Sequence, residues 1–311
     1  MRPGSQAVRP LPMTEPVRFA FPAMGSECVF HLPAAHLQVA SAAEAEVIRI
    51  EHRYSRYRAD SVLARINRLA AAGGELEVDV ETAALLDYAV ACHHKSGGLF
   101  DITTGILRRA WDFSTGRSPA PGEIERWLPY VGLDKIRWAR PVLSFPVAGV
   151  ELDFGGIGKE YAADRAAAIC AEAGVVHGLI DLGGDIRVIG PRPDGSPWVV
   201  QICDPRSPGN FIGTVALAGG GLATSGDYAR CIVIDGVRHG HILHPHTGWP
   251  VRGLAGVSIV ADTCLLAGSV ATIAMLKGPA GVAWLAELGV RCLWADTTGG
   301  CGGTEAGPGR A

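Results

Sequence analysis

The sequence lacks the features that would assign it to several common classes. Its eight cysteines form no CxxC pair, so a zinc site built on paired cysteines is not expected. The net charge is −3 and no basic block is present, which disfavours nucleic acid as a partner. No uninterrupted apolar run reaches the length of a membrane span, and the N-terminal stretch lacks the apolar core of a secretory signal. We therefore expect no membrane span and a cytoplasmic location.

Composition and patterning indicate one globular domain with short tails. The chain has 311 residues, of which 48% are apolar and 19% are charged, enough to build a packed core. We predict the domain over residues 17–295, a disordered tail over residues 1–16 and a flexible glycine-rich tail over residues 296–311. Runs of short strands are followed by helices without regular βαβ alternation, which favours an α+β fold.

One of the glycine clusters has features of an anion-binding turn. In DFGGIGKEY, Asp153 ends a predicted strand, glycines form a turn and Lys159 opens a predicted helix. Backbone N–H groups at a helix start suit a phosphate, and a lysine there adds positive charge. The pattern is neither a P-loop nor a GxGxxG fingerprint. A plain strand-to-helix turn is an alternative of at least equal weight.

Two further turns carry acidic residues. LIDLGGDIRVIG places Asp185 on a double-glycine turn, where it contacts a ligand, a metal or a base, or stabilises its own turn; the motif alone favours the last. SGGLFDITTG places Phe100 beside Asp101. A ring next to a carboxylate can hold a flat heterocycle, and the alternative is that Phe100 is buried at a helix end.

The segment RHGHILHPHTGWPV carries four histidines, His239, His241, His244 and His246. Imidazole suits zinc, nickel or copper, so a transition-metal site is one interpretation. We favour the alternative that His239 and His246 are solvated and that His244 satisfies a local hydrogen bond. Histidine clusters without acid or cysteine partners often bind no metal.

Taken together and in order, the motifs resemble one family, the ApbE-like FAD:protein FMN transferases. The resemblance runs from about residue 18 to about residue 295 and rests on these pieces: AMGSEC, RYSRYRADSVLARIN, SGGLFDITTG, ELDFGGIGKEYAADRAA, GLIDLGGDIRVIG, ATSGDYAR, HILHPHTGWPV and VSIVADTCLLAGSVATIAMLKG. It implies mixed or antiparallel sheets with flanking helices, and a cleft for FAD between two lobes.

The resemblance also implies a reaction. Members of this family cleave the pyrophosphate of FAD, join FMN through a phosphoester to a Thr or Ser of a target protein and release AMP, normally with magnesium. A hydroxyl is a poor nucleophile without a base, and the diphosphate charge must be neutralised. FAD and an acceptor protein are therefore the expected partners. Many members act outside the cytoplasm.

Site residues follow from the matching motifs. The resemblance implies that His241 is the general base, with Lys159, Asp185 and Thr247 in support. The FAD contacts that it implies are Met24, Tyr57, Leu99, Phe100, Asp101, Asp153, Lys159 and Ile242.

The implied metal site departs from the family pattern. The family helix usually reads like ADALATA, with its aspartate and threonine as magnesium ligands, together with a backbone oxygen from the glycine turn. Here the helix reads AGSVATI, so Gly268 replaces the aspartate and Thr272 and the carbonyl of Gly156 remain. His244 likewise replaces an acid in the histidine loop. Magnesium prefers hard oxygen ligands, so we expect the absence of a carboxylate to weaken its binding.

Three functions remain open at this stage. His241, Lys159 and the glycine turns favour a transferase, or a hydrolase that cuts FAD with water in place of a partner hydroxyl. Gly268 and His244 favour an FAD-binding protein with weakened or lost transferase activity.

Overall fold

A computed structural model describes residues 15–207, 209–228 and 230–305. Its largest sheet has eight strands in the order β1-β2-β6-β7-β10-β13-β14-β15, and every neighbouring pair is antiparallel. The strands span Val17–Ala23 (β1), Ser26–Leu32 (β2), Gly178–Leu182 (β6), Asp185–Gly190 (β7), Gly220–Gly226 (β10), Leu254–Ala261 (β13), Arg291–Asp296 (β14) and Cys301–Gly303 (β15). The α+β prediction is confirmed.

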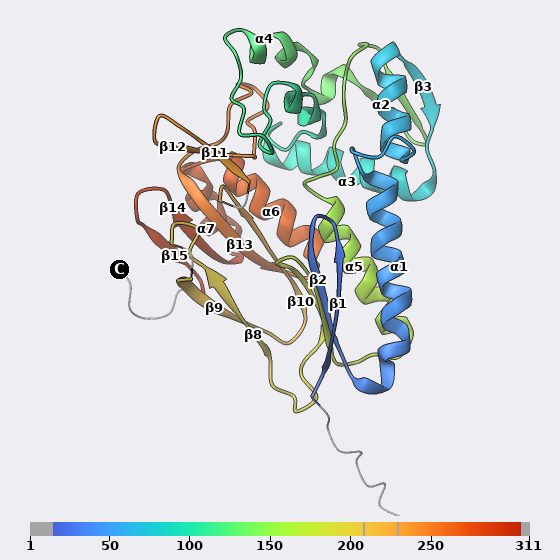
Figure 1. Ribbon diagram of the computed structural model, residues 1–311, viewed down its shortest axis with the longest axis vertical. Helices are drawn as coiled ribbons and strands as arrows, with labels where there is room; N and C mark the ends of the chain where they lie inside the picture. The colour runs from blue at the N-terminus through green and yellow to red at the C-terminus, as the bar shows by residue number, and fades with distance from the viewer. Residues whose placement is uncertain (1–14, 208, 229, 306–311) are drawn as a thin grey trace, which may run out of the picture.

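Both faces of this sheet are covered (Figure 1). Helices α1 (Leu37–Tyr54), α5 (Gly158–Glu172) and α6 (Cys264–Leu276) form one layer, with α7 (Ala280–Leu288) beside α6. A ribbon of β8 (Trp198–Cys203) and β9 (Phe211–Leu217) packs on the other face. Successive side chains of a strand point to opposite faces, so in β6 Leu179 joins the ribbon cluster and Ile180 joins the helix-side core.

The segment between α1 and α5 forms a second, smaller part of the molecule at the top of Figure 1. A three-stranded sheet in the order β3-β5-β4 lies here, together with helices. The elements are α2 (Val62–Ala72), β3 (Gly74–Glu77), α3 (Val80–Ser96), η2 (Ile102–Arg109), α4 (Glu123–Trp127), η3 (Leu128–Tyr130), η4 (Leu133–Lys135), β4 (Arg137–Ala139) and β5 (Val142–Phe145). The short elements outside this part are η1 (Ala34–His36), β11 (Cys231–Ile234) and β12 (Val237–Gly240).

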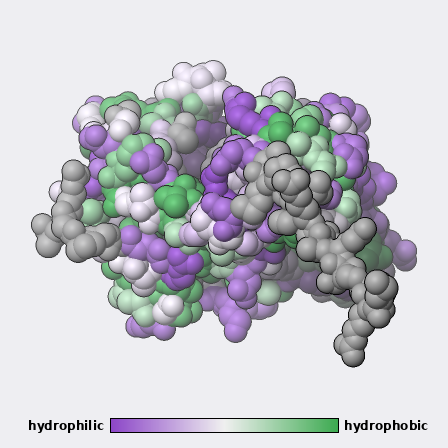
Figure 2. Space-filling view, turned by 90° about the horizontal axis from the view of Figure 1, so that it is seen from below, coloured by the Kyte–Doolittle hydropathy of each residue, from purple (hydrophilic) through white to green (hydrophobic). Residues whose placement is uncertain are grey.

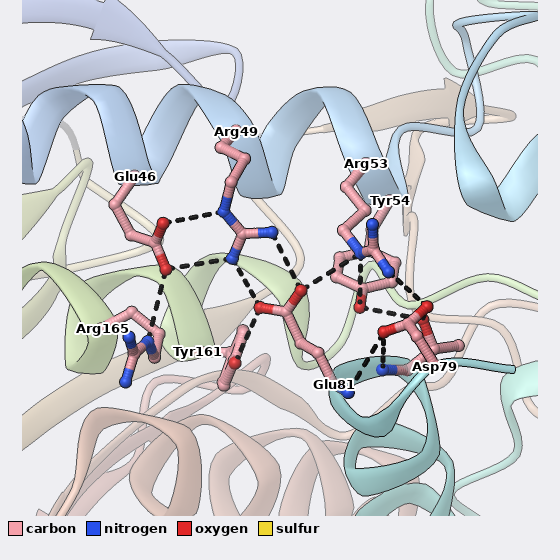
Figure 3. Close-up of polar contacts among 9 residues, drawn as sticks. Glu46, Arg49, Arg53, Tyr54, Asp79, Glu81, Tyr161 and Arg165 are labelled. Atoms are coloured by element: carbon pink, nitrogen blue, oxygen red, sulfur yellow. Dashed lines mark hydrogen bonds and ion pairs between the residues drawn. The ribbon is translucent and has the colours of Figure 1, made fainter. Parts of the chain in front are cut away.

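A charged network joins α1 to the start of α3 and to α5 (Figure 3). Glu81 accepts hydrogen bonds from Arg49 at 2.6 and 2.9 Å and from the Tyr161 hydroxyl at 2.9 Å. Glu46 pairs with Arg49 and also accepts from Arg165 at 3.3 Å. Because Tyr161 and Arg165 lie on α5, the network fixes the helix whose first turn carries Lys159.

Local signals in the sequence mark several element ends correctly. Met24 and Gly25 form the turn between β1 and β2, and Gly183 and Gly184 form the turn between β6 and β7. Ser61 caps α2 by accepting a hydrogen bond from the Ala64 N–H at 2.9 Å, as its position before the helix predicts. Gly97 ends α3 with a φ of 69°, a conformation that favours glycine.

The structure bears on the predicted C-terminal tail but on little of the predicted N-terminal tail. Residues 1–14 lie outside the described residues. The prediction of a flexible tail over residues 296–311 is wrong for Cys301–Gly303, which form β15 and pair with Leu293–Ala295 of β14. A Cβ on Gly302 would lie 2.8 Å from the Trp294 ring. The glycines that suggested low complexity therefore let this strand lie close to a tryptophan.

The described surface shows no large segregated apolar face in Figure 2, and the cysteines form no disulfide. Seen from below the view of Figure 1, hydrophilic and hydrophobic residues are intermixed on the described part of the surface (Figure 2). Among the described residues, no helix is both long and apolar enough to span a bilayer. All eight cysteines lie in the described part of the chain, and each is free.

Candidate functional site

The first turn of α5 meets the turn between β6 and β7. The Nζ of Lys159 lies 3.0 Å from Oδ2 of Asp185. Burial raises the pKa of Asp185, although Lys159 and a hydrogen bond from the Thr224 backbone oppose this. Burial alone would lower the pKa of Lys159, but the Asp185 carboxylate raises it overall. The lysine therefore stays charged, and two predicted catalytic residues form an ion pair between a half-buried lysine and a buried aspartate.

The glycine turn leaves the start of α5 available to an anion. The residue before the helix, Ile157, makes no side-chain cap. Asp153 stabilises the preceding turn by accepting a hydrogen bond from the Gly155 N–H at 2.9 Å. No capping side chain is present at Ile157 to neutralise the positive end of the helix dipole. The first turn carries one acid, Glu160, and Lys159 beside it adds a full positive charge.

Arg56 links the smaller part of the molecule to this turn. Its Nη1 pairs with Oδ2 of Asp153, and its guanidinium lies 5.0 Å from the ring centroid of Tyr57. The Tyr57 side chain is unusual for an aromatic because it is 80% exposed. The arrangement presents a ring face and a positive charge together, which suits a ligand with a flat ring and a phosphate.

His241 lies among positive charges. Solvent reaches its ring, but the surrounding protein makes desolvation the largest cause that lowers its pKa. Arg230, Arg56 and Lys159 lower it further, and a hydrogen bond to the backbone of Arg230 acts in the opposite direction. A neutral imidazole at physiological pH is the state that a general base needs.

The turn between β1 and β2 carries Met24 next to Arg230. Met24 has a φ of 54° and Gly25 a φ of 70°, as a two-residue turn between antiparallel strands requires. Its backbone N–H donates to Oε1 of Glu51 at 2.9 Å. A Cβ on Gly25 would lie 3.4 Å from Nη2 of Arg230, so this turn borders the group of positive charges. An open cavity of about 680 Å³ lies along β1 and β2, bordered by Gly25 and Glu51, rather than at Lys159.

The SGGLFD segment is directed inward. Phe100 is buried in the core, and a Cβ on Gly156 would lie 3.3 Å from its ring. Asp101 is also buried, and its carboxylate accepts hydrogen bonds from Thr103 and from the N–H of Leu133 at 3.0 Å. The burial alternative for Phe100 is the one observed. Leu99 and Ile242 are half-buried against the same core.

The predicted metal residues lie where α5 and α6 pack together. The Thr272 hydroxyl is 2.8 Å from the Ser225 hydroxyl. A Cβ on Gly268 would lie 2.5 Å from Oε1 of Glu160. The Oε2 atom of Glu160 is buried and has no hydrogen-bond partner among the described residues. Burial, followed by the nearby charge of Asp185, raises the pKa of Glu160.

His239 differs in its surroundings from His244 and His246, which contact each other. His239 is buried, with its ring centroid 6.0 Å from that of Trp111, so the prediction that it is solvated is wrong; an apolar aromatic neighbour covers it. His246 is exposed, and its N–H donates to Nδ1 of His244 at 3.2 Å, the local hydrogen bond predicted for His244. Within the described ranges, no group of three or more His, Cys, Asp or Glu could hold a metal.

Thr247 has a structural role in this loop. It is exposed, and its hydroxyl accepts a hydrogen bond from the Trp249 N–H at 3.3 Å.

Sequence reasoning missed Arg56, Arg230 and Glu160. Each lies inside one of the motif segments, but a single charged residue has no spacing pattern that separates a site residue from a solvated one. Only the fold brings Arg56 and Arg230 to His241 and places Glu160 against Gly268.

These features define an α+β protein with a site for a polyanionic ligand and a neutral histidine suited to proton transfer. The chain belongs to the ApbE family, whose pattern matches residues 24–294. The family predicted from the motifs is thereby confirmed.

Relatives of known activity support this assignment. The FAD:protein FMN transferase of Salmonella typhimurium is 30% identical over 238 residues, which cover 72% of this chain and 67% of the relative. The FAD:protein FMN transferase of Haemophilus influenzae is 27% identical over 240 residues, covering 74% of this chain and 69% of the relative.

Solved structures match the fold along most of the chain. The crystal structure of the ApbE protein of Thermotoga maritima has a TM-score of 0.85 and 31% identity, and the match covers 94% of this chain and 97% of that one. The apo form of the Pseudomonas stutzeri flavinyl transferase ApbE has a TM-score of 0.80 and 28% identity, with coverage of 94% and 95%.

Proposed function

We propose that this chain is an FAD:protein FMN transferase, which cleaves FAD and attaches FMN through a phosphoester to a Thr or Ser of an acceptor protein. The proposal rests on the Lys159–Asp185 pair at the start of α5 and on His241, whose pKa is lowered by burial and by the nearby charges of Arg230, Arg56 and Lys159. A base that must stay unprotonated and cations that can hold a diphosphate are thus combined in one place. The family and the named activity of its relatives support the same reaction.

The reaction balances with the residues present. The acceptor hydroxyl oxygen attacks the phosphorus on the FMN side of the diphosphate and forms the new P–O bond. His241 takes the proton from that hydroxyl. The bond between this phosphorus and the bridging oxygen breaks, and AMP leaves with the electron pair. Lys159, Arg56 and the start of α5 stabilise the negative charge that develops on the phosphate oxygens.

Asp185 is a positioning residue in this mechanism. Its buried carboxylate lies 3.0 Å from Nζ of Lys159 and holds the ammonium at the start of α5. Without it, the lysine would retain its charge but lose its fixed position, and orientation contributes strongly to transfer between bound groups.

The donor atoms present fit a magnesium ion. The hydroxyl of Thr272 and the carbonyl of Gly156 are hard oxygens of the kind that magnesium prefers. The carboxyl group of Glu160 lies beside Gly268, and its buried Oε2, which has no hydrogen-bond partner among the described residues, would supply a further oxygen. When bound, the ion neutralises phosphate charge.

Two other outcomes use the same site. If water replaces the acceptor hydroxyl, the protein is an FAD pyrophosphatase that releases FMN and AMP. If FAD binds without bond cleavage, the protein is a flavin-binding relative of the transferases.

Mass spectrometry separates these functions. The purified chain is incubated with FAD and Mg²⁺, with and without a flavin-acceptor domain. The proposal predicts an acceptor mass gain equal to FMN together with AMP release. Free FMN and AMP without an acceptor mass gain would establish the hydrolase, and intact bound FAD would establish the flavin binder.

A pair of histidine variants tests the role of the base. His241→Ala is expected to lose acceptor modification while still binding FAD. His246→Ala is the matched control, because His246 is an exposed histidine of the same loop that contacts His244. Equal loss in both variants would contradict the assignment of His241.

A further inference from the structure

The Glu160 side chain fills the space beside Gly268. A Cβ built on Gly268 would lie 2.5 Å from Oε1, 2.6 Å from Cγ and 2.8 Å from Cδ of Glu160. Atoms that are not bonded do not approach so closely. Any side chain at position 268 therefore requires Glu160 to move, and the volume that an aspartate at 268 would occupy already holds a carboxylate.

The carboxyl group of Glu160 is buried near Lys159, which pairs with a different acid. Glu160 is 7% exposed, and its Oε2 has no hydrogen-bond partner among the described residues. The neighbouring ammonium of Lys159 lies at Asp185 instead, at 3.0 Å. Keeping a buried carboxyl group ionised is costly unless a positive charge joins it. A bound cation would supply that charge.

Two further oxygen donors belong to the segments that carry Glu160 and Gly268. Thr272 follows Gly268 by four residues on α6 and so lies on the same helical face. Gly156 precedes Glu160 by four residues, in the turn that leads into α5. A carboxylate, a hydroxyl and a backbone carbonyl are the ligand types of a hard divalent cation.

We propose that Glu160 supplies the anionic oxygen for a divalent cation in place of position 268, and that glycine at 268 is needed to make room for it. The inference deepens the proposed function, on which it rests for the identity of the ion as magnesium. If position 268 simply lacked a ligand, Gly268→Asp would strengthen metal binding; this inference predicts that the substitution weakens it. With Glu160 present, a second carboxylate would collide with the first and repel it.

Metal binding can be measured without turnover. Mn²⁺ accepts the same ligand types as magnesium and is titrated into the full chain while EPR reports the free ion. The titrations are run with and without FAD. The variants are Glu160→Gln, Gly268→Asp, the double variant Glu160→Ala with Gly268→Asp, and the control Glu172→Gln. Glu172 is an exposed glutamate on the same helix. Alanine at 160 keeps the helix propensity high.

The proposal predicts that Gly268→Asp weakens Mn²⁺ binding when Glu160 is present and restores it when residue 160 is alanine. Glu160→Gln and Gly268→Asp each weaken Mn²⁺ binding at least about tenfold, and the double variant recovers most of the affinity. Glu172→Gln binds as the wild type does. Thermal unfolding in EDTA checks that each variant is folded, and if Glu160→Gln fails to fold, the comparison of Gly268→Asp with the double variant still decides.

Several results would overturn the inference. These are wild-type affinity in Glu160→Gln, tighter binding in Gly268→Asp than in the wild type, and no Mn²⁺ binding by the wild type in either condition. Activity is a separate readout. If Mn²⁺ affinity depends on Glu160 but no FMN is transferred and no AMP is released, the proposed function fails and this inference stands.

Discussion

The pKa values of the acids on the two sides of α5 are shifted in opposite directions. Towards α1 and α3, Glu46 and Glu81 each pair with Arg49, and these contacts lower the pKa of both acids. Towards α6 and β7, burial raises the pKa of Glu160, Asp164 and Asp185. The first side is a compensated structural network (Figure 3). On the second side Asp185 and Asp164 pair with one basic residue each, Lys159 and Arg187, but burial dominates, and Glu160 Oε2 has no hydrogen-bond partner among the described residues. Acids perturbed by burial are common at functional sites.

The largest expected effect comes from removing the cation that pairs with Asp185 on the second side. Lys159→Met leaves Asp185 buried without its partner, so the free energy of unfolding should fall by about 3 kcal/mol. FMN transfer should fall about 100- to 1,000-fold, because a group that stabilises developing charge is lost. Chemical denaturation and acceptor mass spectrometry measure the two losses.

The control for this variant is Lys95→Met, which removes an exposed lysine near the end of α3. It should change neither quantity. A Lys159→Met variant with wild-type transfer would remove Lys159 from the mechanism.

Breaking the network on the first side should separate stability from chemistry. Glu81→Ala removes the acceptor for Arg49, Arg53 and Tyr161, and hydrogen bonds to charged groups each contribute about 1.5–3 kcal/mol. The free energy of unfolding should fall by about 2 kcal/mol. Transfer per folded molecule should change less than threefold. A loss of transfer as large as that of Lys159→Met would make the network part of the site.

The two sides should also respond to pH with opposite signs. The pKa of Glu81 is lowered on folding, so its stabilisation is present above 4.5 and is lost as the pH falls. The pKa of Asp164 is raised on folding, so stability is lost as the pH rises above 3.8. Glu81→Gln should flatten the acid side of the stability profile, and Asp164→Asn should flatten the decline at higher pH. Urea denaturation between pH 3 and 8 measures both, and equal signs would contradict the comparison.

The smallest expected effect on stability comes from substituting the exposed Tyr57. Tyr57→Ala should leave the free energy of unfolding within about 0.5 kcal/mol, because the side chain is 80% exposed. The KM for FAD should rise about tenfold if the ring stacks on a flat part of the ligand. Tyr57→Phe keeps the ring and loses the hydroxyl that accepts from Arg56, so it should behave almost as the wild type. An unchanged KM in Tyr57→Ala would remove this contact.

Much of the fold could be predicted from the sequence because its signals are local. The glycine turn between β6 and β7 and the cap at Ser61 depend on neighbouring residues, and both are present in the structure. The strand at Cys301–Gly303 could not be predicted, because its stability comes from pairing with β14 rather than from its own composition.

The site could be predicted in part. The motifs indicated Lys159, Asp185 and His241, and the first two form an ion pair. From the sequence alone, Gly268 indicates the loss of a metal ligand. No spacing rule connects it to Glu160, which lies more than 100 residues earlier. That relation exists only where α5 and α6 pack together, and it changes the meaning of the substitution.

The most direct test of the account is anomalous diffraction from crystals of the wild-type chain grown with FAD and Mn²⁺. The account predicts a manganese peak within coordination distance, about 2.2 Å, of a Glu160 carboxylate oxygen and the Thr272 hydroxyl. Manganese bound to the FAD diphosphate without contact to Glu160 would contradict it.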